Sequence, residues 1–220
     1  MEREQRVAIF IDGSNLYHSL DENCGRADLD FEAFSYKLTD NRTLFRTYYY
    51  NIRQDEQKGQ SAQDQQKFLA SLYTVPHLEV RLGTSKYRGD QLVEKGVDIM
   101  LATDLLQFAY KDLYDIGIVV SGDGDFAYAV QAFKDMGKHV LVAAFPANLS
   151  KELGQVADSK EYFTPDYFSD LWSRRRGPGR SGSYSNDQGR RYRRPPPRPR
   201  QPEDTDPGRQ RDFDERDDDF

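Results

Sequence analysis

The chain has 220 residues, which is enough for one ordinary domain with its own core and additional material, and its single cysteine, Cys24, excludes an internal disulfide. The net charge of −6 is unevenly spread: residues 174–200 hold ten Arg and one Asp, residues 201–220 hold three Arg and nine acidic residues, and residues 1–173 carry −9. Because the domain is acidic, it lacks the overall basic surface of a dedicated nucleic-acid binder, so any basic nucleic-acid surface on it must be local.

No apolar run approaches the roughly 18 to 20 residues of a membrane span, and the N-terminus lacks the small-residue cleavage site of a signal peptide. A lone thiol also suits a reducing compartment, so we expect a cytoplasmic protein. After Trp172 the apolar periodicity stops and Arg, Gly, Ser and Pro dominate. We therefore predict one domain over residues 1–173, a disordered Arg-rich segment over residues 174–200 and a disordered acidic tail over residues 201–220.

Strand and helix patterns alternate along the domain. Val7–Ile11 is a continuous apolar run ending in Asp-Gly-Ser-Asn, which is typical of a strand buried on both faces. The patterns that follow predict an amphipathic segment over 31–38, helices over 14–20, 62–74, 96–111 and 126–136, and strands over 44–51, 77–82, 116–120 and 138–145. This alternation predicts a three-layer α/β/α sandwich with a mostly parallel sheet, whose functional groups gather at the carboxyl ends of the strands.

Four aspartates lie where a strand or loop meets a helix: Asp12, Asp98, Asp123 and Asp125. Two carboxylates about 4 Å apart repel each other by roughly 1 kcal/mol in water and roughly 4 kcal/mol in a protein-like dielectric, so a cluster needs a compensating cation. Hard divalent cations prefer oxygen ligands, and Mg²⁺ typically keeps several waters beside one or two carboxylates. The sequence therefore predicts that these four aspartates bind Mg²⁺ or Mn²⁺.

Asn15 follows Asp12 by three residues, which is about one helical turn. Its amide is a candidate to orient the Asp12 carboxylate, a metal-bound water or a substrate phosphate, and Ser14 and Ser121 are lesser candidates for the same role. Asp104 lies about 240° round the helix from Asp98, so we expect it either to be structural or to support the site without binding the metal directly.

Helix capping is the alternative explanation for these aspartates, because Asp is a preferred N-cap residue. Capping accounts for one of Asp123 and Asp125, but one helix has one N-cap, so it does not account for both. Asp98 falls in a first helical turn, where an acid also interacts favourably with the helix dipole.

Competing motifs are weaker. Gly122, Gly124 and Ala127 match a dinucleotide-binding fingerprint, but the intervening aspartates would repel a pyrophosphate and no ribose-binding acid follows about 20 residues on. The same segment lacks the ligand and the glycine that a calcium-binding loop requires, and no phosphate-binding loop with the Gly-Lys-Ser/Thr signature occurs.

The three histidines, His18, His77 and His139, show no zinc-ligand spacing and are interpreted as structural. The run Tyr48–Tyr50 is interpreted as strand packing rather than as a base-stacking platform. Candidate contacts to an RNA backbone are the cations Lys86, Arg88 and Lys95, for which solvated loop charge is the alternative, and Arg174, Arg175 and Arg176.

Three ordered motifs, IFIDGSNLYHSL, KGVDIMLATDLL and IGIVVSGDGDFAYAVQAFKDMGKHVLVAAF, resemble the NYN domain, the LabA-like branch of the PIN-like nuclease superfamily, over about residues 5–172. The resemblance implies a PIN-like sandwich and metal-dependent RNA hydrolysis. It places Asp12, Asn15, Asp98, Asp123 and Asp125 at the acidic site of that family. We therefore predict a Mg²⁺- or Mn²⁺-dependent ribonuclease. The alternative is a non-catalytic regulator that binds RNA, or protein partners through its tail.

The opposite charges of the last two segments predict an internal competition. If residues 201–220 fold back on the Arg-rich segment, deleting them tightens RNA binding at low salt, because more cationic side chains then reach the phosphates. Binding isotherms of the full and shortened chains at low ionic strength measure this effect. Unchanged or weaker binding by the shortened chain rules the competition out.

Overall fold

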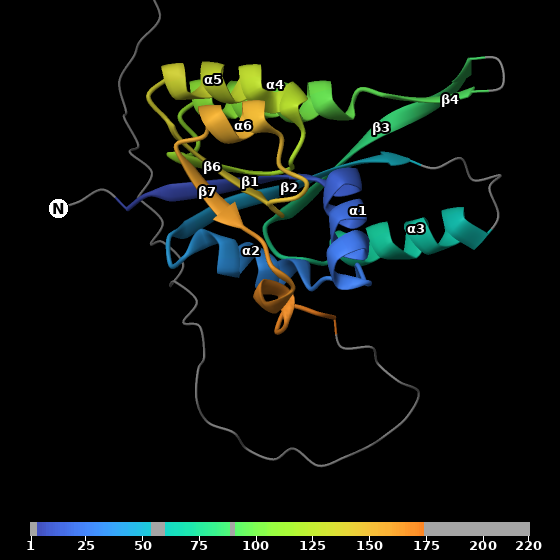
Figure 1. Ribbon diagram of the computed structural model, residues 1–220. Helices are drawn as coiled ribbons and strands as arrows, with labels where there is room; N and C mark the ends of the chain where they lie inside the picture. The colour runs from blue at the N-terminus through green and yellow to red at the C-terminus, as the bar shows by residue number, and fades with distance from the viewer. Residues whose placement is uncertain (1–3, 54–59, 89–90, 174–220) are drawn as a thin grey trace, which may run out of the picture. The chain divides into compact units, whose positions relative to one another are not determined.

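The structure is a computed structural model that describes residues 4–53, 60–88 and 91–173 (Figure 1). The predicted segments 174–200 and 201–220, including Arg174, Arg175 and Arg176, lie outside these residues. In chain order the helices and strands are β1 (Arg6–Asp12), α1 (Gly13–Cys24), α2 (Phe31–Thr39), β2 (Thr43–Arg53), α3 (Gln60–Leu72), β3 (Leu78–Arg88), β4 (Gln91–Lys95), α4 (Val97–Tyr110), β5 (Ile116–Val120), η2 (Gly124–Phe126), α5 (Ala127–Asp135), β6 (His139–Ala144), α6 (Lys151–Val156), β7 (Ser159–Tyr162) and η3 (Pro165–Phe168).

In the part of the chain that is described, seven strands form one sheet in the order β4-β3-β2-β1-β5-β6-β7. Every neighbouring pair is parallel except β3 and β4. The chain passes outward from β1 through β2 and β3, and then returns to place β5 on the other side of β1. Such a reversal opens a crevice at the carboxyl ends of the two central strands. Asp12 ends β1, and Ser121 directly follows β5, so both lie at this crevice.

Both faces of the sheet are covered, as the apolar run at the start of the chain predicts. Alternate residues of β1 enter different cores: Val7, Ile9 and Ile11 pack with α1, α2 and α3, whereas Ala8 and Phe10 pack with α4, α5 and α6. Figure 1 shows these two groups of helices on opposite sides of the sheet. The predicted three-layer α/β/α sandwich is thereby confirmed.

The tyrosine run of β2 follows the same alternation. Tyr48 and Tyr50 enter the core beneath α4, Tyr49 enters the opposite core, and all three are buried, which confirms that they pack rather than form an exposed stacking platform. The hydroxyl of Tyr50 donates a hydrogen bond to Asp104 Oδ2 at 3.0 Å, and burial raises the pKa of Tyr50. Asp104 therefore has the structural role expected of it.

The sequence patterns did not predict β4, α6, β7 or the extension of β3 beyond residue 82. The strand β7 is short and polar, and two of its four residues are exposed, as is common at the edge of a sheet. The extension of β3 beyond residue 82 and β4 likewise contain few apolar residues, so they show no periodicity of a buried element.

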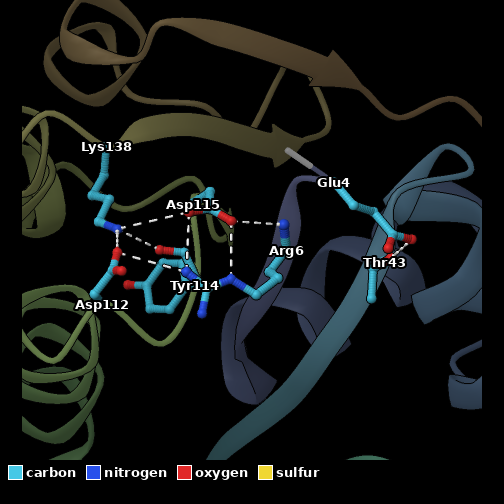
Figure 2. A network of polar contacts seen from close by, with 7 residues as sticks. All are labelled: Glu4, Arg6, Thr43, Asp112, Tyr114, Asp115 and Lys138. Carbon is cyan, nitrogen blue, oxygen red and sulfur yellow. Dashed lines mark hydrogen bonds and ion pairs between the residues drawn. The ribbon is translucent and has the colours of Figure 1, made fainter. Parts of the chain in front are cut away.

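The amino ends of the central strands are held by ion pairs at the edge opposite the crevice (Figure 2). Arg6 at the start of β1 donates to Asp115 through its backbone amide at 2.9 Å and through Nε at 3.0 Å. Lys138, just before β6, pairs with Asp112 and donates to the carbonyl oxygen of Tyr114 at 2.7 Å. These contacts join β1, β5 and β6 where the strands begin.

A second polar anchor joins β6 to the segment before β7. Asp158 accepts a hydrogen bond from the Val140 amide at 2.9 Å and pairs with Lys134 at 3.0 Å and with His139 at 3.7 Å. Burial pushes the pKa of Asp158 upward, but the Val140 amide, Lys134 and His139 outweigh this effect and hold the pKa below its usual value. The charged form of Asp158 is therefore favoured by folding.

The substitution Asp158→Asn is expected to lower the free energy of unfolding by about 1 kcal/mol at pH 7, because it keeps an acceptor for the amide but removes the ion pairs. A depressed pKa contributes stability that is complete above the unfolded-state pKa near 4 and is lost as the pH falls through the folded-state value. Urea unfolding at pH 7 and at the lowest pH at which both proteins fold measures the difference.

The difference between the two proteins should therefore shrink on acidification, and a constant difference would contradict the charge argument. Asp170→Asn is a matched control, because the Lys37–Asp170 pair lies at the surface with 69% of the Asp170 side chain exposed. This exposed pair should contribute less.

Candidate active site

Asp12 occupies the last position of β1 and the N-cap of α1. One carboxylate oxygen, Oδ1, accepts a hydrogen bond from the Asn15 amide at 3.1 Å, and the other, Oδ2, accepts one from the Ser121 hydroxyl at 3.2 Å. Burial raises the pKa of Asp12, the two hydrogen bonds lower it, and the charges of Asp98 and Asp123 raise it further, so that the net shift is upward. Three carboxylates therefore act on one another here.

The side chain of Asn15 joins the start of α1 to the loop after β5. Its Oδ1 accepts a hydrogen bond from the backbone amide of Gly122 at 3.1 Å. Because an N–H group can only donate, the oxygen of Asn15 must face Gly122, and its two N–H donors point elsewhere. The backbone of Asn15, rather than its side chain, therefore holds the Asp12 carboxylate.

Asp123 and Asp125 differ in their surroundings. Asp123 is the N-cap of η2, and its Oδ1 accepts a hydrogen bond from the Asp125 amide at 3.0 Å. The Asp123 amide donates to the Ser121 hydroxyl oxygen at 3.1 Å, so Ser121 contacts both Asp12 and the Asp123 backbone. Asp125 is exposed and does not line the pocket described below. The capping explanation thus applies to Asp12 and Asp123, in addition to any functional role.

An open pocket of about 260 Å³ lies at the carboxyl ends of the central strands. Its carboxylates come from the end of β1, the first turn of α4 and the loop after β5. The residues that line it are Asp12, Ser14, Asn15, His18, Ile52, Gly96, Val97, Asp98 and Asp123. Three of the four aspartates predicted from the sequence therefore share one pocket, and metal binding by all four stays a prediction.

The donor set of the pocket fits a hydrated divalent ion. Within residues 4–53, 60–88 and 91–173, no three His, Cys, Asp or Glu side chains are close enough together to hold an ion by themselves. Mg²⁺, however, typically binds one or two carboxylates and completes its shell with water, and a pocket of this volume has room for several waters at about 30 Å³ each. The carboxylate of Asp12 retains free lone pairs beyond its two hydrogen bonds.

Sequence reasoning missed several lining residues. Among them, His18 is the one whose side chain can take part in chemistry. The sequence alone favours a structural role for His18, because it is isolated from other metal ligands. Its spacing of three residues from Asn15 places both side chains on the same surface of α1, and this spacing was the available signal.

The cations Lys86, Arg88 and Lys95 occupy positions on the hairpin of β3 and β4, which leads into α4. The antiparallel register pairs position 86 with 93, 88 with 91 and 84 with 95. Positions 86 and 88 therefore belong to β3 and position 95 to β4. Their contact with RNA stays a prediction.

The loop between β6 and α6 packs directly on the site. The amide of Ser150 donates to the Gly122 carbonyl oxygen at 2.8 Å, and Asn148 is held by Asn23 at 3.1 Å and by Glu22 at 3.0 Å. A Cβ atom at position 122 would lie 1.9 Å from the Asn148 carbonyl oxygen. Only glycine fits at this contact, which brings the two loops together beside Asn15.

The fold is a doubly wound α/β domain with an acidic pocket at the point where the strand order reverses. Comparison with known proteins identifies the family to which this domain belongs. Residues 6–165 match the NYN domain, so the chain belongs to the NYN domain family, in its LabA-like branch within a nuclease superfamily. The chain is 27% identical over 158 residues to the low amplitude and bright protein LabA of Synechococcus elongatus, a match that covers 71% of this chain and 82% of that protein.

Among solved structures, a crystal structure of a Vibrio parahaemolyticus protein of unknown function is similar, with a TM-score of 0.63 and 26% identity over 76% of this chain and 97% of that one. Across the described ranges, none of the helices is both long enough and apolar enough to cross a membrane.

Substitution of alanine for glycine is expected to change the free energy of unfolding in opposite directions at Gly122 and Gly154. Gly122→Ala should lower the free energy of unfolding by about 3 kcal/mol, because its new methyl group meets backbone atoms that cannot rotate away. In α6, Gly154→Ala meets its nearest atom at 3.4 Å, which is ordinary contact, and should stabilise the protein by about 0.5 kcal/mol through helix propensity. Chemical denaturation measures both, and equal effects would refute the steric argument.

Proposed function

We propose that this protein is a metal-dependent ribonuclease that hydrolyses RNA phosphodiester bonds in the acidic pocket. The observation that carries the proposal is the convergence of Asp12, Asp98 and Asp123 on one pocket, in a chain of the NYN family. Burial raises the pKa of Asp12 most, and the charges of Asp98 and Asp123 raise it further, so a cation bound here would be stabilised by the same carboxylates.

Asp12, Asp98 and Asp123 would hold Mg²⁺ or Mn²⁺, which supplies an activated water and neutralises charge on the phosphate when bound. Asn15 has a distinct role, because its side-chain oxygen is engaged by Gly122 and its N–H donors are available to a phosphate oxygen or to a water. Ser14 lines the same wall one residue earlier, but its hydroxyl already donates a hydrogen bond to Asn51 Oδ1 at 3.3 Å. Asp125, which is exposed and does not line the pocket, stays the fourth predicted ligand.

RNA would be drawn to this acidic domain by local cations. Lys86, Arg88 and Lys95 belong to the hairpin that leads to Asp98, and Arg174, Arg175 and Arg176 follow the domain in the chain. Attraction of such cations to phosphates is sequence-independent and falls with salt. We infer that these cations hold the RNA by its phosphate backbone and that the pocket hydrolyses one phosphodiester bond.

A second candidate is a regulator that binds RNA or a protein partner without cleaving it. Two observations favour it: no closed set of metal ligands occurs in the described residues, and Asp12 and Asp123 both cap local structure. In this case the carboxylates are retained for the fold, and the tail recruits partners.

Cleavage assays separate the two candidates. Single-stranded and structured RNA are incubated with the protein and Mg²⁺, Mn²⁺ or EDTA, and then with Asp12→Asn and Asp123→Asn. The enzyme predicts metal-dependent cleavage that falls on the order of 100-fold or more in each variant, because a charged ligand is lost from the site. Asn15→Asp, which keeps the acceptor for Gly122 but removes both donors, should also lose activity while folding normally.

Asp125→Asn tests the fourth predicted ligand, since Asp125 is exposed outside the pocket lining. Retained activity in this variant restricts the ligands to the three lining aspartates, and lost activity adds Asp125 to them. Intact RNA in every metal, with RNA binding retained, would exclude the nuclease and favour the regulator.

A further inference from the structure

Two aromatic side chains stand together on the outer surface of α1. The rings of Tyr17 and His18 meet edge to face, with centroids 5.5 Å apart and planes at 80°. The inner surface of the helix is buried by Leu16 and Leu20, so neither ring is needed for the core, and 55% of Tyr17 is exposed. An exposed aromatic ring presents a flat apolar surface that is available for stacking.

The direction of α1 turns these rings toward the pocket. Cα–Cβ bonds in a helix tilt toward its N-terminus, and long side chains cover the preceding turn. The preceding turn of α1 holds Ser14 and Asn15, which line the pocket, and His18 itself is part of the lining. Tyr17 does not line the pocket, but it lies three residues after Ser14 and therefore on the same side of α1 as that lining residue.

The next turn of α1 limits what this surface can bind. Asp21 and Glu22 are exposed and acidic, so a ligand that carries phosphates is repelled from the C-terminal half of the helix. The first turn of α1 carries no acidic side chain, and the first half of the helix presents the aromatic pair and the Asn15 N–H donors beside the pocket, where a metal ion would offset the carboxylates. A nucleotide fits the first half, with its base on the ring and its phosphate toward the pocket.

We propose that Tyr17 and His18 bind the nucleotide next to the scissile bond. Tyr17 stacks on its base, and His18 donates a ring N–H to its phosphate. This inference rests on the proposed function and adds a preference to it. In a duplex both faces of a base are covered by its neighbours, so stacking on Tyr17 requires an unpaired base. The pair therefore selects single-stranded RNA at the site.

Binding is measured separately from cleavage, in full-length protein carrying Asp123→Asn, with Mg²⁺ and enough salt to weaken contacts by the Arg-rich segment. The probes are a fluorescent single-stranded RNA and the same strand with abasic positions. Tyr17→Ala should weaken binding of the RNA about tenfold and leave the abasic strand unchanged, since one base stack is lost. Tyr17→Phe keeps the ring and should bind both strands normally. His18→Ala should weaken both.

Tyr110→Ala is the matched control, because this tyrosine is 85% exposed at the last position of α4, at the opposite end of that helix from Asp98. Equal affinities of the Tyr17→Ala and Tyr110→Ala proteins would overturn the inference, even if the wild-type chain cleaves RNA. Conversely, suppose that Tyr17→Ala weakens binding only of the RNA that carries its bases, while the wild-type chain cleaves no RNA. That result would support nucleotide binding by Tyr17 and refute the nuclease. Absence of RNA binding by the parent protein would overturn both.

Discussion

Burial of the Asp12 carboxylate is the constraint on which the site depends. A charged group that is 6% exposed must be satisfied by hydrogen bonds, and here the Asn15 amide and the Ser121 hydroxyl satisfy it. These bonds also join β1, α1 and the loop after β5. The buried Asp12 carboxylate therefore connects the three elements that surround it. Repulsion from Asp98 and Asp123 remains, and a cation is the simplest species that relieves it.

The rest of the fold keeps this carboxylate in place. One end of β1 is held by the Arg6–Asp115 pair, the middle is buried in two cores, and the other end carries Asp12. Functional groups on such a rigid strand hold their geometry better than groups on a free loop. The loop that carries Asp123 has no strand of its own, but the close packing of Gly122 against Asn148 supports it from the side.

Most of the fold could be predicted from the sequence, because central elements have a strong local signal. The strand at Val7–Ile11 is apolar throughout since both of its faces are buried, and the run Tyr48–Tyr50 is aromatic for the same reason. The short edge strand β7, the extension of β3 beyond residue 82 and β4 escaped prediction because their sequences are short and mostly polar. Sequence reasoning also found three of the lining aspartates, since Asp at the end of an element is visible without a structure.

The sequence by itself determined the layer order of this protein and the placing of carboxylates at the ends of its elements, because apolar periodicity and capping residues act over a few neighbouring positions. Only the tertiary structure decided which of these groups meet. Asp98 joins Asp12 and Asp123 through the return of the chain to the far side of β1, while Asp125 faces solvent, two residues beyond Asp123. His18 enters the pocket because of the rotation of α1 on the sheet. Such encounters depend on strand order and helix rotation, which follow from the packing of the whole core rather than from any local pattern.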